Sequence, residues 1–207
     1  MRRAVEEYTE AIIKMMLNKS PGIDGLTLEF YSTFWESIKY LIVFILNKCH
    51  KDNQLSFSQR TSALTLLSKT DDPLKLDKCR PISLLNVDLK LLSYTLAQRL
   101  KKILPKLINE DQTGYIKNRF IGFNLRQIQD IIDYSNIYKI EGAIIFLDFS
   151  KAFDSLEWDF MFSTLKHYGF NDSFVTWVET LYNNIQTCVI NNGWLSEIFK
   201  NTRGNSQ

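Results

Sequence analysis

Hydrophobic positions in the first fifty residues recur at the spacing of an α-helix. Val5, Tyr8, Ile12 and Met16 lie three or four residues apart, which predicts one amphipathic helix. A longer series predicts a second: Leu28, Tyr31, Phe34, Ile38, Leu41, Ile42, Ile45 and Cys49. Residues 21–25 between them hold a proline and two glycines, which predicts a turn-rich connector. We assign no chemistry to this connector.

The pattern changes to short apolar runs in the next part of the chain. Residues 63–68 and 79–85 predict two strands on either side of a polar stretch. Pro81 lacks a backbone donor, so the second strand is expected at a sheet edge or at an irregularity. Two leucine- and isoleucine-rich series then predict helices with core-facing stripes. They are Leu89, Leu92, Leu96, Leu100, Ile103, Leu104 and Leu107, ending near Pro105, and Leu125, Ile128, Ile131 and Ile132.

The run Ile144–Leu147 predicts a buried strand that begins near Gly142 and delivers Asp148 at its end. A carboxylate where a rigid strand meets solvent is a suitable Mg²⁺ ligand. Asp154 follows six residues later. For Asp154 and Ser155 taken alone, capping of the next helix is the favoured interpretation.

The last fifty residues predict two helices and a hairpin. The first helix spans 155–168 and ends at Gly169, and the second is expected to be capped by Asp172 or Ser173. Asn192-Gly193 separates two strand patterns, 187–191 and 194–199. Asn-Gly favours a two-residue hairpin because both turn positions need positive φ.

Composition limits the class of protein. The chain is 45% hydrophobic and 23% charged, typical of a globular domain with a substantial core. Its longest apolar run, Tyr40–Leu46, is far shorter than a membrane helix, and residues 1–7 lack the apolar stretch of a signal peptide. Three separated cysteines and two histidines predict neither a disulfide framework nor a zinc cluster. We therefore expect a soluble intracellular protein.

Charge is segregated along the chain although the net charge is only +2. Residues 54–119 hold twelve Lys/Arg against six Asp/Glu, and residues 120–207 hold six against ten. A basic middle beside an acidic last third fits a polynucleotide surface next to a metal-binding carboxylate site. Solvated helix faces explain the same charges equally well.

Five ordered blocks resemble the motifs of reverse transcriptases of non-LTR, LINE-like retrotransposons, and the order is more specific than any block alone. The catalytic block is Asp148-Phe149-Ser150-Lys151-Ala152-Phe153-Asp154. The other four are Asn18-Lys19-Ser20-Pro21-Gly22-Ile23-Asp24-Gly25, Arg80-Pro81-Ile82-Ser83-Leu84-Leu85-Asn86, Asp111-Gln112-Thr113-Gly114-Tyr115 with Arg119 and Asn124, and Thr202-Arg203-Gly204-Asn205-Ser206-Gln207.

The resemblance implies an α+β fold of the right-hand polymerase type. It divides the chain into a helical N-terminal extension of the fingers (1–53), the fingers and the start of the palm (54–141), and a partial palm (142–207). The implied activity is RNA-directed DNA synthesis from an RNA template, a DNA primer and deoxynucleoside triphosphates, with two Mg²⁺ ions. No membrane partner is implied.

Residue by residue, the resemblance assigns roles to the matching positions. Asp148 would bridge the metals, helped by the Phe149 carbonyl. Lys69 and Arg80 would contact the triphosphate, since guanidinium and ammonium groups suit phosphate oxygens.

The remaining assignments concern the sugar, the nucleotide pocket and the nucleic acid. Phe153 would exclude a ribose 2′-hydroxyl, although core packing is its ordinary role. Gln207 would support the nucleotide pocket, although Ser206 replaces the usual basic residue. Arg119 and Asn124 would contact template or primer, with loop stabilisation an equal alternative.

One expected motif is absent from the chain. An aromatic-x-Asp-Asp hairpin follows the Arg-Gly block in such enzymes, and Asp71-Asp72 lies too far upstream to replace it. We therefore expect an incomplete polymerase domain with an incomplete second metal site, inactive as this chain. The alternative is a catalytically dead remnant that at most binds nucleic acid or protein. A group II intron-type or telomerase-like relative is a weaker option.

Overall fold

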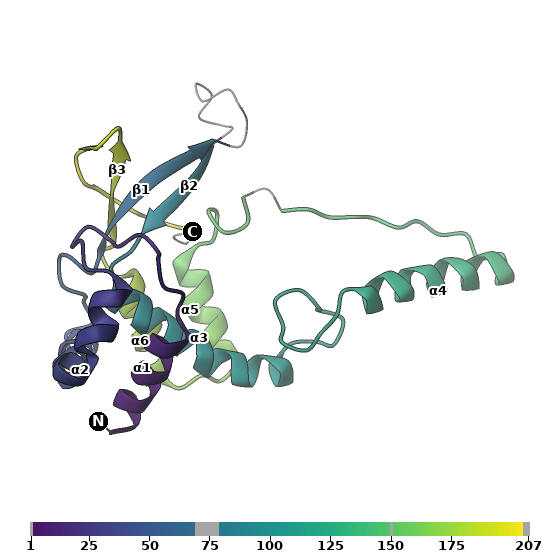
Figure 1. Ribbon diagram of the computed structural model, residues 1–207. Coiled ribbons are helices and arrows are strands. Elements are labelled where there is room, and N and C mark those ends of the chain that lie inside the picture. The colour runs from purple at the N-terminus through teal and green to yellow at the C-terminus, as the bar shows by residue number, and fades with distance from the viewer. Residues whose placement is uncertain (1, 69–78, 150, 205–207) are drawn as a thin grey trace. The chain divides into compact units, whose positions relative to one another are not determined.

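The computed structural model describes residues 2–68, 79–149 and 151–204 (Figure 1). Two compact units emerge, one formed by residues 1–96 together with 151–207, the other by 97–150. Each unit is described by itself. The fold is α+β, as predicted, with helices and one small mixed sheet.

The two N-terminal helices form, as the periodicity predicted, and they pack against each other. Helix α1 is Arg2–Lys14 and helix α2 is Leu28–Lys51. The Trp35 indole Nε1 of α2 donates to Thr9 Oγ1 of α1 at 2.8 Å. Helix α2 begins after Thr27, whose hydroxyl accepts from the Phe30 amide, and this N-cap satisfies one of the free amides of the first turn.

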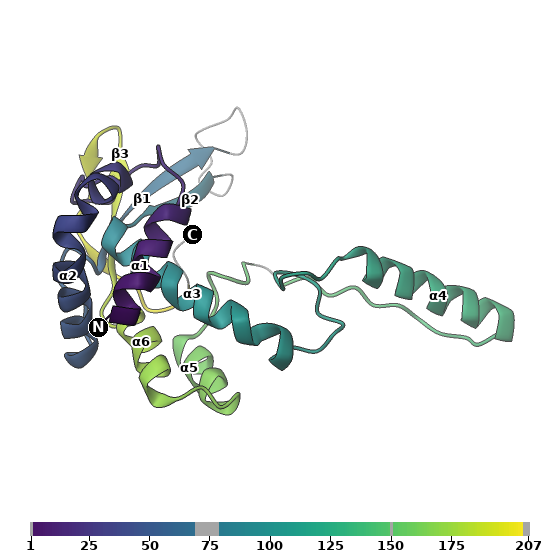
Figure 2. The ribbon, with the colours of Figure 1, turned by 60° about the horizontal axis from the view of Figure 1, so that its bottom comes forward.

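The core of the first unit is built from these helices, the first half of α3 (Val87–Leu107) and α6 (Asp172–Tyr182). Its fully buried side chains include Leu46, Leu91, Leu92 and Val43. Each such side chain contributes about 1.5–3 kcal/mol through burial. Figures 1 and 2 both show α1, α2 and α3 adjacent to one another.

The sheet has five strands with a mixed topology. The strands are β1 (Thr61–Ser68), β2 (Cys79–Leu84), β3 (Gln186–Asn191), β4 (Trp194–Leu195) and β5 (Phe199–Lys200). Their order is β2-β1-β3-β4, and β5 also pairs with β3. The two predicted strands before α3 pair antiparallel, and β2 lies at the edge, as its proline required.

Strand β1 also pairs with β3, in parallel register from Thr61↔Gln186 to Leu64↔Val189. The hairpin after β3 forms as predicted, because Asn192 and Gly193 both have positive φ, 49° and 83°. Helix α5 (Trp158–His167) and α6 precede this hairpin. The cap of α6 is Asn171, which accepts from the Phe174 amide at 2.8 Å, so the expectation of Asp172 or Ser173 was wrong by a residue or two.

The second unit contains the end of α3 and helix α4 (Gly122–Tyr138). Helix α4 was expected to present a core-facing stripe, but it has no buried residue. Leu125 and Ile131 are exposed, and Ile128 and Ile132 are only half-buried. The periodicity predicted the helix correctly and its burial wrongly, since burial also requires an opposing surface.

No helix among the described residues is long and apolar enough to cross a membrane.

Candidate functional site

Arg80, the predicted triphosphate contact, lies near the tip of the β1–β2 hairpin. It is opposite Leu67 in the antiparallel register and is exposed. Strand β2 pairs with β1 and with no other strand among the described residues. The position leaves Arg80 open to an anionic ligand. The second predicted contact, Lys69, lies outside the described residues.

The segment before Asp148 differs from its prediction. Residues 140–149 form neither helix nor strand, and Phe146 and Leu147 are 81% and 83% exposed. The expected buried strand is therefore not formed. An apolar run stabilises a strand only where a neighbouring backbone and a packing face are present, and the described residues supply neither here.

Asp148 and Phe149 are both exposed at the end of this segment. A carboxylate and a backbone carbonyl are hard oxygen donors, the type that Mg²⁺ takes in proteins. Nowhere in the described ranges do three or more His, Cys, Asp or Glu side chains gather as a metal cluster. Asp148 and Phe149 are therefore chemically suitable donors for such an ion.

The turn after Asp148 is shaped by hydrogen bonds to Lys151, whose φ is +50°. The amides of Asp154 and Ser155 both donate to the Lys151 carbonyl, at 2.9 and 3.0 Å. Helix α5 starts three residues later, with Glu157 at its N-cap position. Capping by Asp154 or Ser155 was therefore the wrong interpretation. Phe153 in this turn is about half exposed.

The Arg203-Gly204 block packs directly against this turn. The Gly204 amide donates to the Leu156 carbonyl at 2.9 Å, and its carbonyl accepts from Trp158 Nε1 at 2.8 Å. A Cβ on Gly204 would lie 2.7 Å from the Asp154 carbonyl oxygen, and its φ is +81°. Only glycine fits both the conformation and the approach. Two blocks some fifty residues apart are thus brought into contact.

Trp158 is a site residue that the sequence analysis missed. Besides bonding Gly204, its ring lies 5.6 Å from the Tyr182 ring of α6. Burial raises the pKa of the Tyr182 phenol. A single tryptophan at the start of a helix does not indicate, from one sequence, that its indole will bond to a glycine far along the chain. Gln207, expected in the same region, lies outside the described residues.

Arg119 and Asn124 hold the loop that follows α3. The Arg119 guanidinium donates to the carbonyls of Gln112, Pro105 and Ile108, at 2.7, 3.1 and 2.9 Å, and also to that of Asn109. Asn124 Nδ2 donates to the Asp111 carbonyl at 2.7 Å. The loop-stabilising alternative therefore has direct geometric support, and nucleic-acid contact by these residues stays a prediction.

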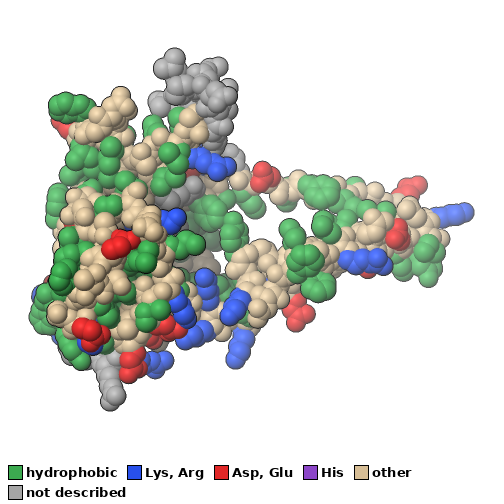
Figure 3. Space-filling view, viewed as in Figure 1, with side chains coloured by type: hydrophobic (Ala, Val, Ile, Leu, Met, Phe, Trp, Pro, Cys, Tyr) green, Lys and Arg blue, Asp and Glu red, His purple; other side chains and the backbone are tan. Residues whose placement is uncertain are grey.

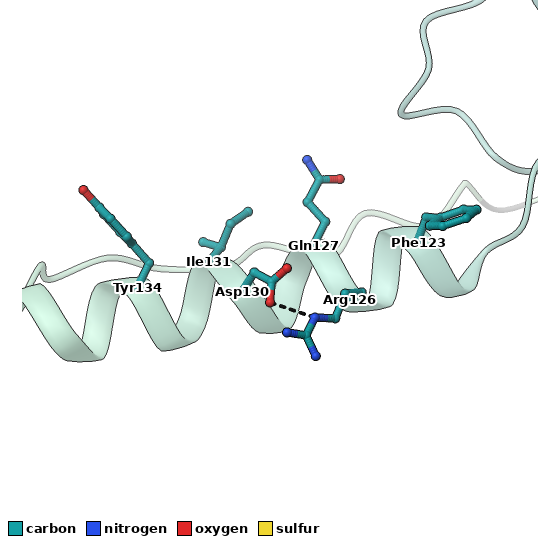
Figure 4. A pocket seen from close by; sticks show the side chains of 6 residues that line it. All are labelled: Phe123, Arg126, Gln127, Asp130, Ile131 and Tyr134. Carbon is teal, nitrogen blue, oxygen red and sulfur yellow. Dashed lines mark ion pairs between the residues drawn. The ribbon is translucent and has the colours of Figure 1, made fainter.

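Helix α4 carries a shallow groove on its exposed face. Figure 4 shows Phe123, Gln127, Ile131 and Tyr134 projecting to one side, while Arg126 pairs with Asp130 at 2.8 Å. Figure 3 shows exposed hydrophobic side chains over the same helix. The groove lies along a single helix, so it is open rather than enclosed.

Comparisons with known proteins identify the family. Residues 67–207 match the model of the reverse transcriptase (RNA-dependent DNA polymerase) family. The chain belongs to this family.

Its relatives come from retrotransposable elements. It is 33% identical to the transposon TX1 149 kDa protein of Xenopus laevis over 92% of this chain and 14% of that protein. It is 30% identical to the retrovirus-related Pol polyprotein of the type-2 element R2DM of Drosophila melanogaster, over 99% of this chain and 19% of the relative. The chain thus spans less than a fifth of these relatives. They confirm the non-LTR, LINE-like reverse transcriptase inferred from the motifs.

Proposed function

We propose that this chain supplies the fingers and part of the palm of an RNA-directed DNA polymerase. In this proposal residues 1–53 extend the fingers, residues 54–141 form the fingers and the start of the palm, and residues 142–207 form part of the palm. The observation that carries the proposal is the contact of Gly204 with the turn after Asp148, because two motifs of the family meet there.

The proposed substrates are an RNA template, a DNA primer and a deoxynucleoside triphosphate. Arg80, with Lys69, binds the triphosphate. Two parallel N–H donors of Arg80 suit phosphate oxygens, and its exposed edge position allows the approach. Arg119 and Asn124 hold the loop that borders the nucleic acid, and Gln207 supports the nucleotide.

The reacting groups gather around Asp148 in this proposal. Asp148 and the Phe149 carbonyl would hold Mg²⁺, and the bound ion would supply activation of the primer hydroxyl and neutralisation of charge on the pyrophosphate. A second ion would need further carboxylates beside Asp148. Phe153 stands beside the sugar and excludes a 2′-hydroxyl by its volume.

The test is primer extension by the full-length protein that contains this chain. Asp148→Asn keeps the shape of the side chain and removes its charge. We expect kcat to fall by about a thousandfold, the equivalent of about 4 kcal/mol of transition-state stabilisation. RNA binding, measured by fluorescence anisotropy, is expected to persist.

Asp172→Asn is the matched control, because Asp172 lies in the first turn of α6 and has no proposed part in the reaction. Substantial extension by Asp148→Asn would remove the metal role. RNA binding by a wild-type protein that extends no primer would instead favour the binding-module alternative.

A further inference from the structure

Asn86 joins the two open ends of the β1–β2 hairpin. It lies two residues after β2 and is 1% exposed. Its Nδ2 donates to the carbonyl of Ser58, three residues before β1, at 3.0 Å. This single side chain therefore connects the segment before β1 to the segment after β2, at the base of the hairpin.

The connector between α1 and α2 covers Asn86 at Gly22. A Cβ on Gly22 would overlap Asn86 Oδ1 and the Asn86 amide nitrogen, far inside van der Waals distance, and would lie 2.6 Å from the Leu85 carbonyl carbon. Because two of these atoms are backbone, no side-chain rotation relieves the overlap. The connector is also joined to α3 by Lys90 Nζ, which donates to the Ser20 carbonyl at 3.2 Å.

Gln59 fixes the turn before β1 to the start of α3. Its Nε2 donates to Asp88 Oδ2 at 2.6 Å, while its Oε1 accepts from the Ser56 amide at 3.1 Å. Burial raises the pKa of Asp88 and lowers that of Lys90. Both groups are half-buried, and each has a hydrogen-bond partner, Gln59 for Asp88 and the Ser20 carbonyl for Lys90.

The distal half of the hairpin depends on this base. Strand β3 supports β1 only from Thr61 to Leu64, whereas Arg80 lies opposite Leu67. Four residues separate Leu84 at the base from Arg80, about 13 Å at the rise of a strand. A rotation of about 10° at the base would therefore move Arg80 by about 2 Å, enough to misplace a bidentate contact.

We propose that Asn86, enclosed by Ser58 and Gly22, is a positioning residue that sets the location of Arg80 against the triphosphate. The proposal rests on the function proposed above and gives the connector at residues 21–25 a role in nucleotide binding. Neither Asn86 nor Gly22 touches the substrate. Their effect passes through the β1–β2 hairpin.

The experiment measures steady-state nucleotide incorporation by the full-length protein with Asn86→Ala and Gly22→Ala. We expect the KM for the deoxynucleotide to rise about five- to tenfold in each variant, with kcat within about twofold of wild type. In the double variant the KM is expected to rise by less than the product of the two single increases, because both residues act through the same contact between Asn86 and Gly22.

Leu92→Ala is the matched control for stability. Leu92 is fully buried in α3 and lies outside the hairpin base, so its truncation lowers stability by about 2–5 kcal/mol. It is expected to reduce the active fraction, and hence apparent kcat, with an unchanged KM. A folded Asn86→Ala or Gly22→Ala protein that behaves like this control would overturn the positioning role.

Failure of this inference is distinguishable from failure of the proposed function. If the wild-type protein extends primers and Arg80→Ala raises the KM, an unchanged KM in Asn86→Ala and Gly22→Ala contradicts only the inference. If the wild type incorporates no nucleotide, the proposed function fails and the inference falls with it.

Discussion

Several side chains in the described part of the chain donate hydrogen bonds to the backbone of distant segments. Asn86, Arg119 and Trp158 each donate to the carbonyl of a residue at least seven positions away. Each therefore stabilises a connection between segments rather than a helix or strand. Such roles are invisible to periodicity, because the partner is a backbone carbonyl that every residue possesses.

Asp88 provides a prediction about pH. Burial raises the pKa of its carboxyl above the usual value of 3.8, so the folded state holds the proton more tightly than the unfolded state. The protonated Asp88 carboxyl therefore favours the folded state at low pH. The free energy of unfolding falls as pH rises from about 4 through the folded-state pKa, because this carboxyl then loses its proton. Asp88→Asn is expected to lose that slope, measured by urea unfolding from about pH 4 to 8.

The exposed Asp172→Asn serves as the control for this pH series and should keep the wild-type slope. Parallel unfolding curves for Asp88→Asn and wild type at every pH would contradict the assignment. The hydrogen bond from Gln59 lowers the pKa of Asp88, whereas burial raises it. The slope of the unfolding free energy against pH therefore reports the net of these two effects.

Arg119 provides a second prediction. Arg119→Met keeps the aliphatic stem and removes the donors to the four carbonyls around Gln112. We expect the loop to lose about 1–2 kcal/mol of local stability. Hydrogen exchange of residues 108–121 would then accelerate, with RNA affinity unchanged. A fall in RNA affinity with unchanged exchange would instead support the nucleic-acid contact.

At the scale of elements, helices were easier to predict than their environments. Helix α2 forms as its periodicity predicted, but only part of the predicted stripe is buried. Phe34 and Leu41 are exposed, whereas the buried residues of the helix are Leu28, Tyr31, Trp35, Ile42, Val43, Leu46 and Cys49. Helix α4 has a similar pattern and no buried side chain. The pattern reports which face could be buried, and only the tertiary structure decides whether it is.

Helix α4 is therefore expected to be the least stable helix in the described part of the chain. Isolated helices of this length are marginal in water, since packing supplies most helical stability. We predict that amides of residues 126–136 exchange with solvent at least about a hundredfold faster than those of α2 residues 40–48. Equal protection would show that α4 is covered in solution.

At the scale of the whole molecule, the sequence predicted the α+β class, the edge position of β2 and the hairpin turn at Asn192-Gly193. It did not predict that β1 pairs in parallel with β3, because pairing across more than a hundred residues leaves no local signal. The prediction of a strand before Asp148 was wrong for a related reason. Its apolar residues specify a preference for burial, whereas a strand also requires a partner backbone.

The parallel pairing of β1 with β3 has a consequence for biosynthesis. Thr61 meets Gln186, so the ladder cannot close until 125 further residues have been translated. At 5–20 residues per second this takes roughly 6–25 seconds. During that time one edge of β1 has no strand to pair with. Helices α1, α2 and α3 precede β3 in the chain and can begin to pack in that interval, while the edge of β1 that will bind β3 remains unpaired.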